Sequence, residues 1–458
     1  MNLFARKRKL RRYKIREVTE KDECKMSLVN TIAERYSEIQ SKNGSALLHN
    51  MREKAYDAYS RMGIPTQRHE EWKYTRLNAL VNQDFRFSNP VLPSAATIET
   101  LKLQEDPAAE LFFANGAFIK EISSFDEDAL VVLPLLEAAG GEYKKYVEKH
   151  LGHSSKYMKD GMNALNQAFV TNGVFVLLKK NKILEQPVYV YHLTDTTEDN
   201  VFVQPRSLFV VEENAQLQLV ETYHNKGAHE SFTNEVIEIA VYENARLEYY
   251  KVQDQEANCH QVGTTHIQQV GKCFTHCVTV TLNGGTVRNN INMILEAPNN
   301  EGHLYGLYMV NGKTHVDNHS IVDNVMPNCF SNEFYKGIMD GNSTGVFNGK
   351  IFVRQDAQKT NAYQSNKNVL MGNSASVNSK PQLEIFADDV KCSHGCTVGR
   401  LDEEALFYLR TRGIDEKNAK ALLLHAFAQD ILEQVKPQPL RKYLEQKINE
   451  RLDIERLD

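Results

Sequence analysis

Apolar residues recur at helical spacing in the first part of the chain. Between about residues 26 and 80 they fall three or four positions apart, at Ile32, Tyr36, Ile39, Leu47, Met51, Ala55 and Ala58. This spacing places side chains on one face of a helix, so it predicts helices that are interrupted at Gly63-Ile64-Pro65. Residues 85 to 165 show no single periodicity and predict an α+β region.

From about Ala164 the pattern changes to short strands rich in β-branched and aromatic residues. Examples are Gly173–Leu178, Val188–Tyr191 and Ser207–Val211, and similar runs continue for roughly 200 residues. The segment Glu-Asn-Ala-Gln-Leu at 213–217 returns as Glu-Asn-Ala-Arg-Leu at 243–247, thirty residues later. A repeat of this period, with strand-like sequence on both sides, predicts the coils of a solenoid.

Asparagine and glycine are frequent among the later strands. Nineteen asparagines lie between Asn258 and Asn378, mixed with glycine and with β segments such as Val278–Thr281. Asn and Gly tolerate the left-handed backbone of tight turns, and stacked Asn side chains can hydrogen-bond along a solenoid. We therefore predict a mainly β fold, a right-handed parallel β-helix. A sandwich and a propeller are the alternatives, and a propeller blade would repeat at about 40 residues.

Helical periodicity returns after Gly399. Asp402 is placed to cap a helix that Gly413 ends. A second helix is expected from Asp415 to Pro437, and one of its faces is formed by Leu424, Phe427, Ile431 and Val435. A final, more charged helix is expected over residues 440–452.

These changes in pattern predict four parts. Residues 1–25 form a basic tail, 26–165 an N-terminal helical and α+β domain, 166–398 the parallel β-helix core, and 399–458 a C-terminal helical domain. Eight of the first 16 residues are Lys or Arg, with no acidic residue among them. We expect this tail to be disordered, and the alternatives are a nucleic-acid arm or a targeting presequence.

Composition restricts the class of protein. With 458 residues, 41% of them apolar, the chain is long enough to bury large cores. The formal net charge of -5 gives no general attraction for nucleic acid or anionic lipid. No apolar run approaches the roughly 18 residues of a membrane span and no signal peptide follows the basic start, so we expect a cytoplasmic protein. Seven scattered cysteines fit free thiols better than a disulfide framework.

Motifs for common enzyme chemistry are missing. The nearest candidate for a phosphate-binding loop, Gly345–Ile351, has the wrong glycine spacing and an isoleucine where a hydroxyl residue would bind magnesium. The sequence also lacks the three spaced glycines of a dinucleotide site and the Gly-x-Ser-x-Gly turn of many hydrolases. We therefore expect no nucleotide site in this chain.

Two possible metal motifs are better explained by packing. His276 lies between Cys273 and Cys277, but no second pair of ligands follows. The segment Arg68–Tyr74 contains a His-Glu pair without a second histidine one helical turn later. We expect its tryptophan, the only one in the chain, to anchor the segment to the core.

A third motif has more suitable spacing. If the chain is extended near Cys392, then Cys392, His394 and Cys396 lie at alternate positions and share one face of a strand. Thiolate and imidazole groups together suit iron or iron-sulfur ligation. The motif stands where the β region meets the terminal helices, at the end of a solenoid, where an open edge is usually capped or paired with a partner.

The same region resembles a known family. Ala-Asp-Asp-Val-Lys-Cys-Ser-His-Gly-Cys-Thr-Val-Gly at 387–399, followed by residues 401–414, is similar to the C-terminal signature of the SufB/SufD family of iron-sulfur cluster assembly proteins. Shorter similarities cover Gly63–Thr66, Glu70–Thr75, Ala164–Asn166 and Gly173–Phe175. The resemblance therefore spans most of the chain beyond the basic tail.

Details of the signature separate two branches of the family. SufB-type members resemble this chain but carry an acidic His-Glu segment there, and an upstream cysteine that holds the nascent cluster. The upstream stretch Tyr363–Leu370 has no cysteine, so the chain looks like the SufD branch. A SufB-type primary scaffold remains an alternative. A carbohydrate-active β-helix enzyme is another, although Asp388 and Asp389 would face opposite sides of a strand and make a poor acid/base couple.

The resemblance implies a non-enzymatic scaffold subunit of the SUF system. Its β-helix would pair edge to edge with a SufB-like paralogue, and the C-terminal helices would dock a SufC-type ATPase that drives cluster assembly and transfer. The apolar face Leu424, Phe427, Ile431 and Val435 is then a candidate either for SufC docking or for the helical core. The sequence leaves open a homodimer of the isolated chain and the binding of flavin or zinc.

The resemblance also assigns roles near the signature. His394 matches the SufD histidine at the SufB interface, a ligand or support for a transient iron-sulfur cluster shared with SufB. Cys392 matches the thiol two residues before it. Cys396 stands where a small residue is commoner, which puts a third ligand in doubt.

Overall fold

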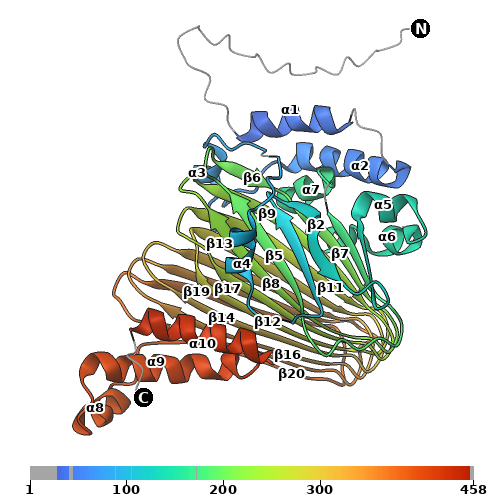
Figure 1. Cartoon of the computed structure of the whole chain (residues 1–458). Helices are drawn as coiled ribbons and strands as arrows, with labels where there is room; N and C mark the ends of the chain where they lie inside the picture. Colours follow the sequence, from blue (N-terminus) through green and yellow to red (C-terminus); the bar gives the residue numbers. More distant parts are fainter. Residues whose placement is uncertain (1–27, 41–44, 88, 105, 172, 454–458) are drawn as a thin grey trace, which may run out of the picture.

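A computed structural model describes residues 28–40, 45–87, 89–104, 106–171 and 173–453 (Figure 1). The predicted basic tail, 1–25, lies outside the described residues. The N-terminal helices that periodicity predicts are present as α1 (Leu28–Gln40) and α2 (Ala46–Met62). Short elements follow them: η1 (Glu70–Trp72), α3 (Asn78–Val81) and α4 (Ala95–Leu101).

Residues 109–168 mix strands and helices. The strands are β1 (Ala109–Ala114), β2 (Ala117–Phe125) and β3 (Leu130–Pro134). The helices are α5 (Leu135–Gly140), α6 (Lys144–His150), η2 (His153–Lys156) and α7 (Gly161–Ala168). Because β1 pairs in parallel with β5, and β3 pairs antiparallel with β4, this region closes the first end of the β structure that follows.

The rest of the β region is a parallel solenoid, as predicted. Its two ten-stranded sheets run β2-β1-β5-β8-β10-β12-β14-β16-β18-β20 and β19-β17-β15-β13-β11-β9-β7-β4-β3, with β6 beside β9. The strands are β4 (Val174–Leu178), β5 (Val188–Asp195), β6 (Val201–Val203), β7 (Arg206–Val211), β8 (Gln216–Lys226), β9 (Ser231–Val241), β10 (Arg246–Asp254), β11 (Cys259–Gln269), β12 (Phe274–Asn283), β13 (Thr286–Leu295), β14 (Glu301–Val310), β15 (His315–Asn324), β16 (Phe330–Met339), β17 (Thr344–Val353), β18 (Asn361–Leu370), β19 (Ser376–Ile385) and β20 (Lys391–Gly399).

The internal echo marks one turn of this solenoid. Gln216 and Arg246, which occupy the same place in the two copies, are paired in the parallel ladder of β8 and β10. Asn214 and Asn244 have φ of 59° and 55°, in the left-handed region that asparagine tolerates. Asparagine therefore turns the chain between strands, as its abundance predicts.

The core has an interior and two outer faces. The largest apolar cluster fills the space between the two sheets along the solenoid. α1, α2 and α7 pack outside β6, β9 and β11, and α5 and α6 pack outside β4 and β7. The C-terminal helices cover the outer face of the other sheet, towards its last strands (Figure 1).

The C-terminal region consists of α8 (Glu403–Thr411), α9 (Glu416–Leu432) and α10 (Gln438–Leu452). The side chain of Asp402 caps α8, as predicted, and the side chain of Asp415 caps α9. Gly413 has φ of 90° and follows the end of α8. The sequence predicts that the second helix reaches Pro437, but α9 ends at Leu432, and Pro437 occupies the N-cap position of α10 instead. Within the described ranges, no helix is long and apolar enough to span a membrane.

Candidate functional site

The last strand, β20, carries the three residues of the thiol and imidazole motif. It stays extended through Gly395 and pairs with β18 in an unbroken parallel register. In this register Cys392, His394 and Cys396 lie beside three buried residues, Ala362, Gln364 and Asn366. Because Ala362 belongs to the core between the sheets, these alternate positions of β20 face the solenoid interior at its last turn.

The three side chains differ in exposure. Cys392 is half-buried and packs against the interior core, whereas His394 and Cys396 are exposed. Burial raises the pKa of the Cys392 thiol, so its proton must be displaced when a metal binds. One imidazole and two thiols thus lie on one open face and could supply mixed nitrogen and sulfur ligands.

A column of polar side chains leads from the interior to His394. Glu333, Gln364 and His394 occupy successive positions in the ladder of β16, β18 and β20. The Gln364 amide nitrogen donates a hydrogen bond of 2.6 Å to Glu333 Oε2. Glu333 is fully buried, and burial raises the pKa of its carboxyl to about 7. The amide oxygen of Gln364 is buried without a hydrogen-bond partner, on the residue that precedes His394 in the column.

The free end of the solenoid has an open strand edge. Among the described strands, β20 pairs only with β18 and β19 only with β17. Pro381 interrupts the donor pattern of β19, but β20 contains no proline. Ile385, Phe386 and Val398 are exposed apolar side chains at this end. A nine-residue edge beside apolar side chains suits the addition of a strand from another protein.

The predicted apolar face of the second C-terminal helix is turned to the solenoid. Leu424 and Ile431 on α9, and Val435 just beyond it, are buried in the cluster between these helices and the sheet. Phe427 is partly buried there, with the Lys336 ammonium 4.3 Å from its ring centre. α8, in contrast, has no buried residue, and its exposed aromatic side chains are Phe407 and Tyr408.

The cysteines near His276 do not converge with it. Cys273 and Cys277 belong to the interior core, and burial raises the pKa of both thiols. The His276 ring lies on the other face of β12 and its Nε2 is 2.8 Å from the carbonyl oxygen of Gln434. Their placement agrees with packing roles.

A buried group of ionisable residues lies deeper in the solenoid. His192, Glu221 and Glu235 have potential ligand atoms within 4.8 Å of one another. The Lys251 ammonium is 2.7 Å from Glu235 Oε2, and the hydroxyl of Tyr223 donates to the same atom. These contacts hold the pKa of Glu235 below its ordinary value despite burial. The ammonium compensates the charge that a cation would otherwise neutralise, so the group is explained as an internal ion network.

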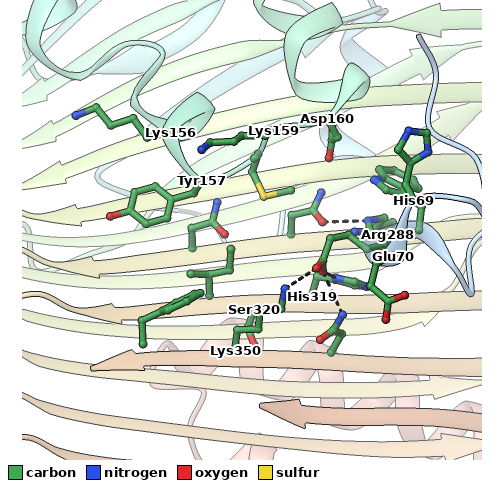
Figure 2. A pocket seen from close by; sticks show the side chains of 18 of the residues that line it. His69, Glu70, Lys156, Tyr157, Lys159, Asp160, Arg288, His319, Ser320 and Lys350 are labelled. Carbon is green, nitrogen blue, oxygen red and sulfur yellow. Dashed lines mark hydrogen bonds and ion pairs between the residues drawn. The ribbon is translucent and has the colours of Figure 1, made fainter. Parts of the chain in front are cut away.

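Sequence reasoning missed a cavity of about 630 Å³ on the outer face of β13, β15 and β17. Figure 2 shows Lys156, Tyr157 and Lys159 on one side of it and His69 and Glu70 on the opposite side. Its lining comes from three separate parts of the chain, residues 69–72, 156–160 and 288–354, so no local sequence motif indicates it. The one local signal was the tryptophan segment: Trp72 is buried as predicted, with the Arg288 guanidinium 3.9 Å from its ring centre.

Comparisons with known proteins agree with this architecture. Residues 192–427 match the family model described as SUF system FeS cluster assembly, SufBD core domain, and residues 24–190 match the SufBD protein N-terminal region. The chain is 32% identical to an iron-sulfur cluster assembly SufBD family protein of Synechocystis sp., over 85% of this chain and 88% of the relative. It is 29% identical to the iron-sulfur cluster assembly protein SufD of Escherichia coli, over 86% and 90%. The chloroplastic protein ABCI7 of Arabidopsis thaliana is 27% identical over 79% of each chain.

Proposed function

The chain belongs to the SufBD family of iron-sulfur cluster assembly proteins, and from this premise we propose that it is the SufD-type scaffold subunit. In this role it pairs with a SufB-like paralogue and carries no catalytic site of its own. The observation that carries the proposal is the position of His394 and Cys392 on the open last strand of the solenoid. A ligand there can serve a cluster that is completed by a second chain.

The side chains beside His394 support the SufD assignment over a SufB-type primary scaffold. β18 is the strand on which a SufB-type cysteine is expected, and its inward residues near the site are Ala362, Gln364 and Asn366. None of them offers a thiolate. The similarity to the Escherichia coli protein named SufD points the same way.

We propose that β20 forms the edge that meets the paralogue. Its unpaired backbone groups would extend the sheet across the interface, and Phe386 and Val398 would be buried there. Pairing at this edge would bring His394 towards the partner's ligands. The cluster is the cargo of the complex, and this chain would supply the His394 imidazole and, after loss of its proton, the Cys392 thiolate.

We assign the docking of a SufC-type ATPase to the exposed side of the C-terminal helices. Leu424 and Ile431 face the solenoid, so they support the position of α9. Phe407 is 69% exposed on α8 and Tyr408 is beside it, so these aromatic side chains are available to a partner. ATP hydrolysis by that partner would then act on the SufB and SufD interface through helices anchored to the solenoid wall.

Co-expression of the full chain with SufB-like and SufC-like proteins tests the assignment. We expect a stable three-component complex and, for His394→Ala, intact assembly with reduced iron and sulfide content after reconstitution. His229→Ala is the matched control, because His229 is also exposed but lies far from β20 in the sequence. A chain that stays alone, or that assembles a stable cluster without the paralogue, contradicts the SufD role, and the second result supports a SufB-type scaffold. Unchanged loading of His394→Ala removes this histidine from the mechanism.

A further inference from the structure

The cavity on the outer face of the solenoid is distinct from the proposed cluster site. Its floor is formed by outward side chains of β13, β15 and β17, and its walls by residues 69–72 and 156–160. A volume of about 630 Å³ falls in the range of small-molecule sites, roughly 300 to 1,000 Å³. Three segments that are distant in sequence thus build one concave site (Figure 2).

The acidic side chains that line this cavity are already engaged. Glu71 contacts Lys350 and lies 3.6 Å from His319 Nδ1, and these contacts lower the pKa of Glu71 to about 2. Glu70 forms an ion pair of 2.7 Å with Lys380, and the carboxylate of Asp160 accepts backbone hydrogen bonds at the start of α7. The carboxylates therefore belong to the protein's own contacts.

The cations of the floor are also paired, but those of one wall are not. Arg354 makes two contacts of 2.8 and 2.9 Å with Asp323, and Arg288 lies 2.8 Å from Asp317. Lys156 and Lys159 are exposed and form no ion pair with any carboxylate in the described part of the chain. This wall consequently presents two ammonium groups that remain free to meet an anion.

Apolar and amide groups complete the lining. Tyr157 stands between the two lysines in sequence, and Ile321 and Phe352 rise from the floor. Two floor amides are incompletely satisfied: Asn292 Nδ2 and Asn348 Oδ1 are buried without a hydrogen-bond partner. Unsatisfied buried polar atoms are costly, and a ligand on the floor could supply their partners only after these amide groups rotate towards the cavity.

We propose that this cavity binds a small organic anion with a flat apolar body. Its negative group, a phosphate, sulfonate or carboxylate, lies at the wall of Lys156 and Lys159. Its apolar part lies over Tyr157, Ile321 and Phe352. Binding connects residues 69–72 with 156–160 across the sheet, and it requires neither the paralogue nor the cluster.

The single tryptophan makes this site directly observable. Trp72 lines the cavity, and the probe 8-anilinonaphthalene-1-sulfonate carries one sulfonate on a flat apolar body. We expect saturable binding to the full chain with probe emission excited through Trp72, because energy transfer falls steeply with distance. Because β19 pairs directly with the floor strand β17, probe bound at the exposed apolar end would also be excited through Trp72, so the lysine variants are needed to distinguish the two places.

Charge reversal separates this site from general adhesion. Lys156→Glu/Lys159→Glu is expected to weaken Trp72-sensitised binding by about tenfold or more. Lys120→Glu/Lys182→Glu makes the same change in net charge at two other exposed lysines and is expected to bind normally. The neutral analogue N-phenyl-1-naphthylamine is expected to bind more weakly than the sulfonate. Its affinity should be the same for the wild-type chain and for both double variants.

Several results would overturn the proposal. They are the absence of sensitised emission from the wild-type chain, equal binding by the two double variants, and equal binding of the charged and neutral probes. Circular dichroism establishes that the variants are folded. If the double reversal fails to fold, the milder Lys159→Gln must still weaken binding of the sulfonate relative to Lys120→Gln.

Discussion

The side-chain amide of Gln364, one strand behind His394 in the ladder, donates a 2.6 Å hydrogen bond to the buried carboxyl of Glu333 on the strand before it. This contact holds the amide group of Gln364 while its oxygen remains without a partner. A ligating histidine usually donates its second ring N–H to such an acceptor, which fixes the tautomer and the ring orientation. Gln364 and His394 are register partners on adjacent strands, so we expect this oxygen to accept a hydrogen bond from the His394 ring when the ring binds a metal.

Replacement of Gln364 by leucine should therefore weaken the proposed ligand without removing it. We expect Gln364→Leu to lower the affinity of the assembled complex for iron by about 10- to 100-fold, the usual effect of losing an outer-shell partner. Nitrogen-15 NMR of the isolated chain should also show a changed tautomer ratio for His394. Gln446→Leu, at an exposed position of α10, is the control. An unchanged tautomer ratio in Gln364→Leu would contradict a hydrogen bond between Gln364 and His394.

Glu333 should make stability decrease as the pH rises. Burial raises the pKa of its carboxyl from 4.5 to about 7. Between pH 4.5 and pH 7 the folded chain therefore keeps a proton on Glu333 that the unfolded chain has lost. Unfolding is then favoured by roughly 3 kcal/mol more above pH 7 than below pH 4.5, as far as this one group is concerned. Glu333→Gln removes the titrating group, so its stability relative to wild type should increase over this interval.

Denaturation in urea at a series of pH values measures this difference. The quantity of interest is the free energy of unfolding of the variant minus that of the wild type, because other titrating groups cancel in it. Glu384→Gln, at an exposed position of β19, should give a difference that does not change with pH. A flat difference for Glu333→Gln would mean that the carboxyl titrates at its ordinary pKa.

The repeat explains why much of the solenoid could be predicted. Asn214 and Asn244 mark equivalent turns because each coil must reverse direction at the same place, and this requirement leaves a local signal. The same period of thirty residues relates Gln364 to His394, so the acceptor behind the proposed ligand could have been found by counting back one coil. The fully buried Glu333 lies 31 residues before Gln364. Because this coil is one residue longer, a fixed step of thirty residues would not have found Glu333 as the third member of the column.

The outer cavity could not be predicted in this way. Trp72 had a local signal as a buried anchor, but the identity of its neighbour Arg288 depends on how the N-terminal segment crosses the sheet. Likewise, the helical spacing of Leu424 and Ile431 predicts a common face without showing whether that face meets the solenoid or a partner. Both choices are made by tertiary packing between distant segments.

The ion pair under Trp72 should be important for stability. Arg288 Nη1 is 2.8 Å from Asp317 Oδ2, and both side chains are 1% exposed. Arg288→Met would leave the Asp317 charge buried with less compensation, and we expect a loss of about 3 to 5 kcal/mol. Arg288→Met/Asp317→Asn should recover a substantial part of this loss because the double variant removes both charges.

Thermal unfolding followed by Trp72 emission measures both variants. The exposed pair Lys180 and Glu213, 2.6 Å apart, provides the comparison: Lys180→Met should cost about 1 kcal/mol or less. If Arg288→Met were no more harmful than Lys180→Met, the pair would not anchor the N-terminal segment. A double variant as unstable as Arg288→Met would assign the loss to the stacked guanidinium instead of the charge pair.

The open end of the solenoid should provide the binding energy for the paralogue. Phe386 is 58% exposed just after β19, at the open end of the solenoid, and full burial of a phenylalanine side chain is worth about 1.5 to 3 kcal/mol. Phe386→Lys should therefore weaken the complex with the SufB-like partner by roughly tenfold to a hundredfold. Leu92→Lys is the matched control, since Leu92 is 61% exposed in the N-terminal region. Dissociation constants from calorimetry with purified chains should separate the two variants, and equal constants would place the interface away from this end.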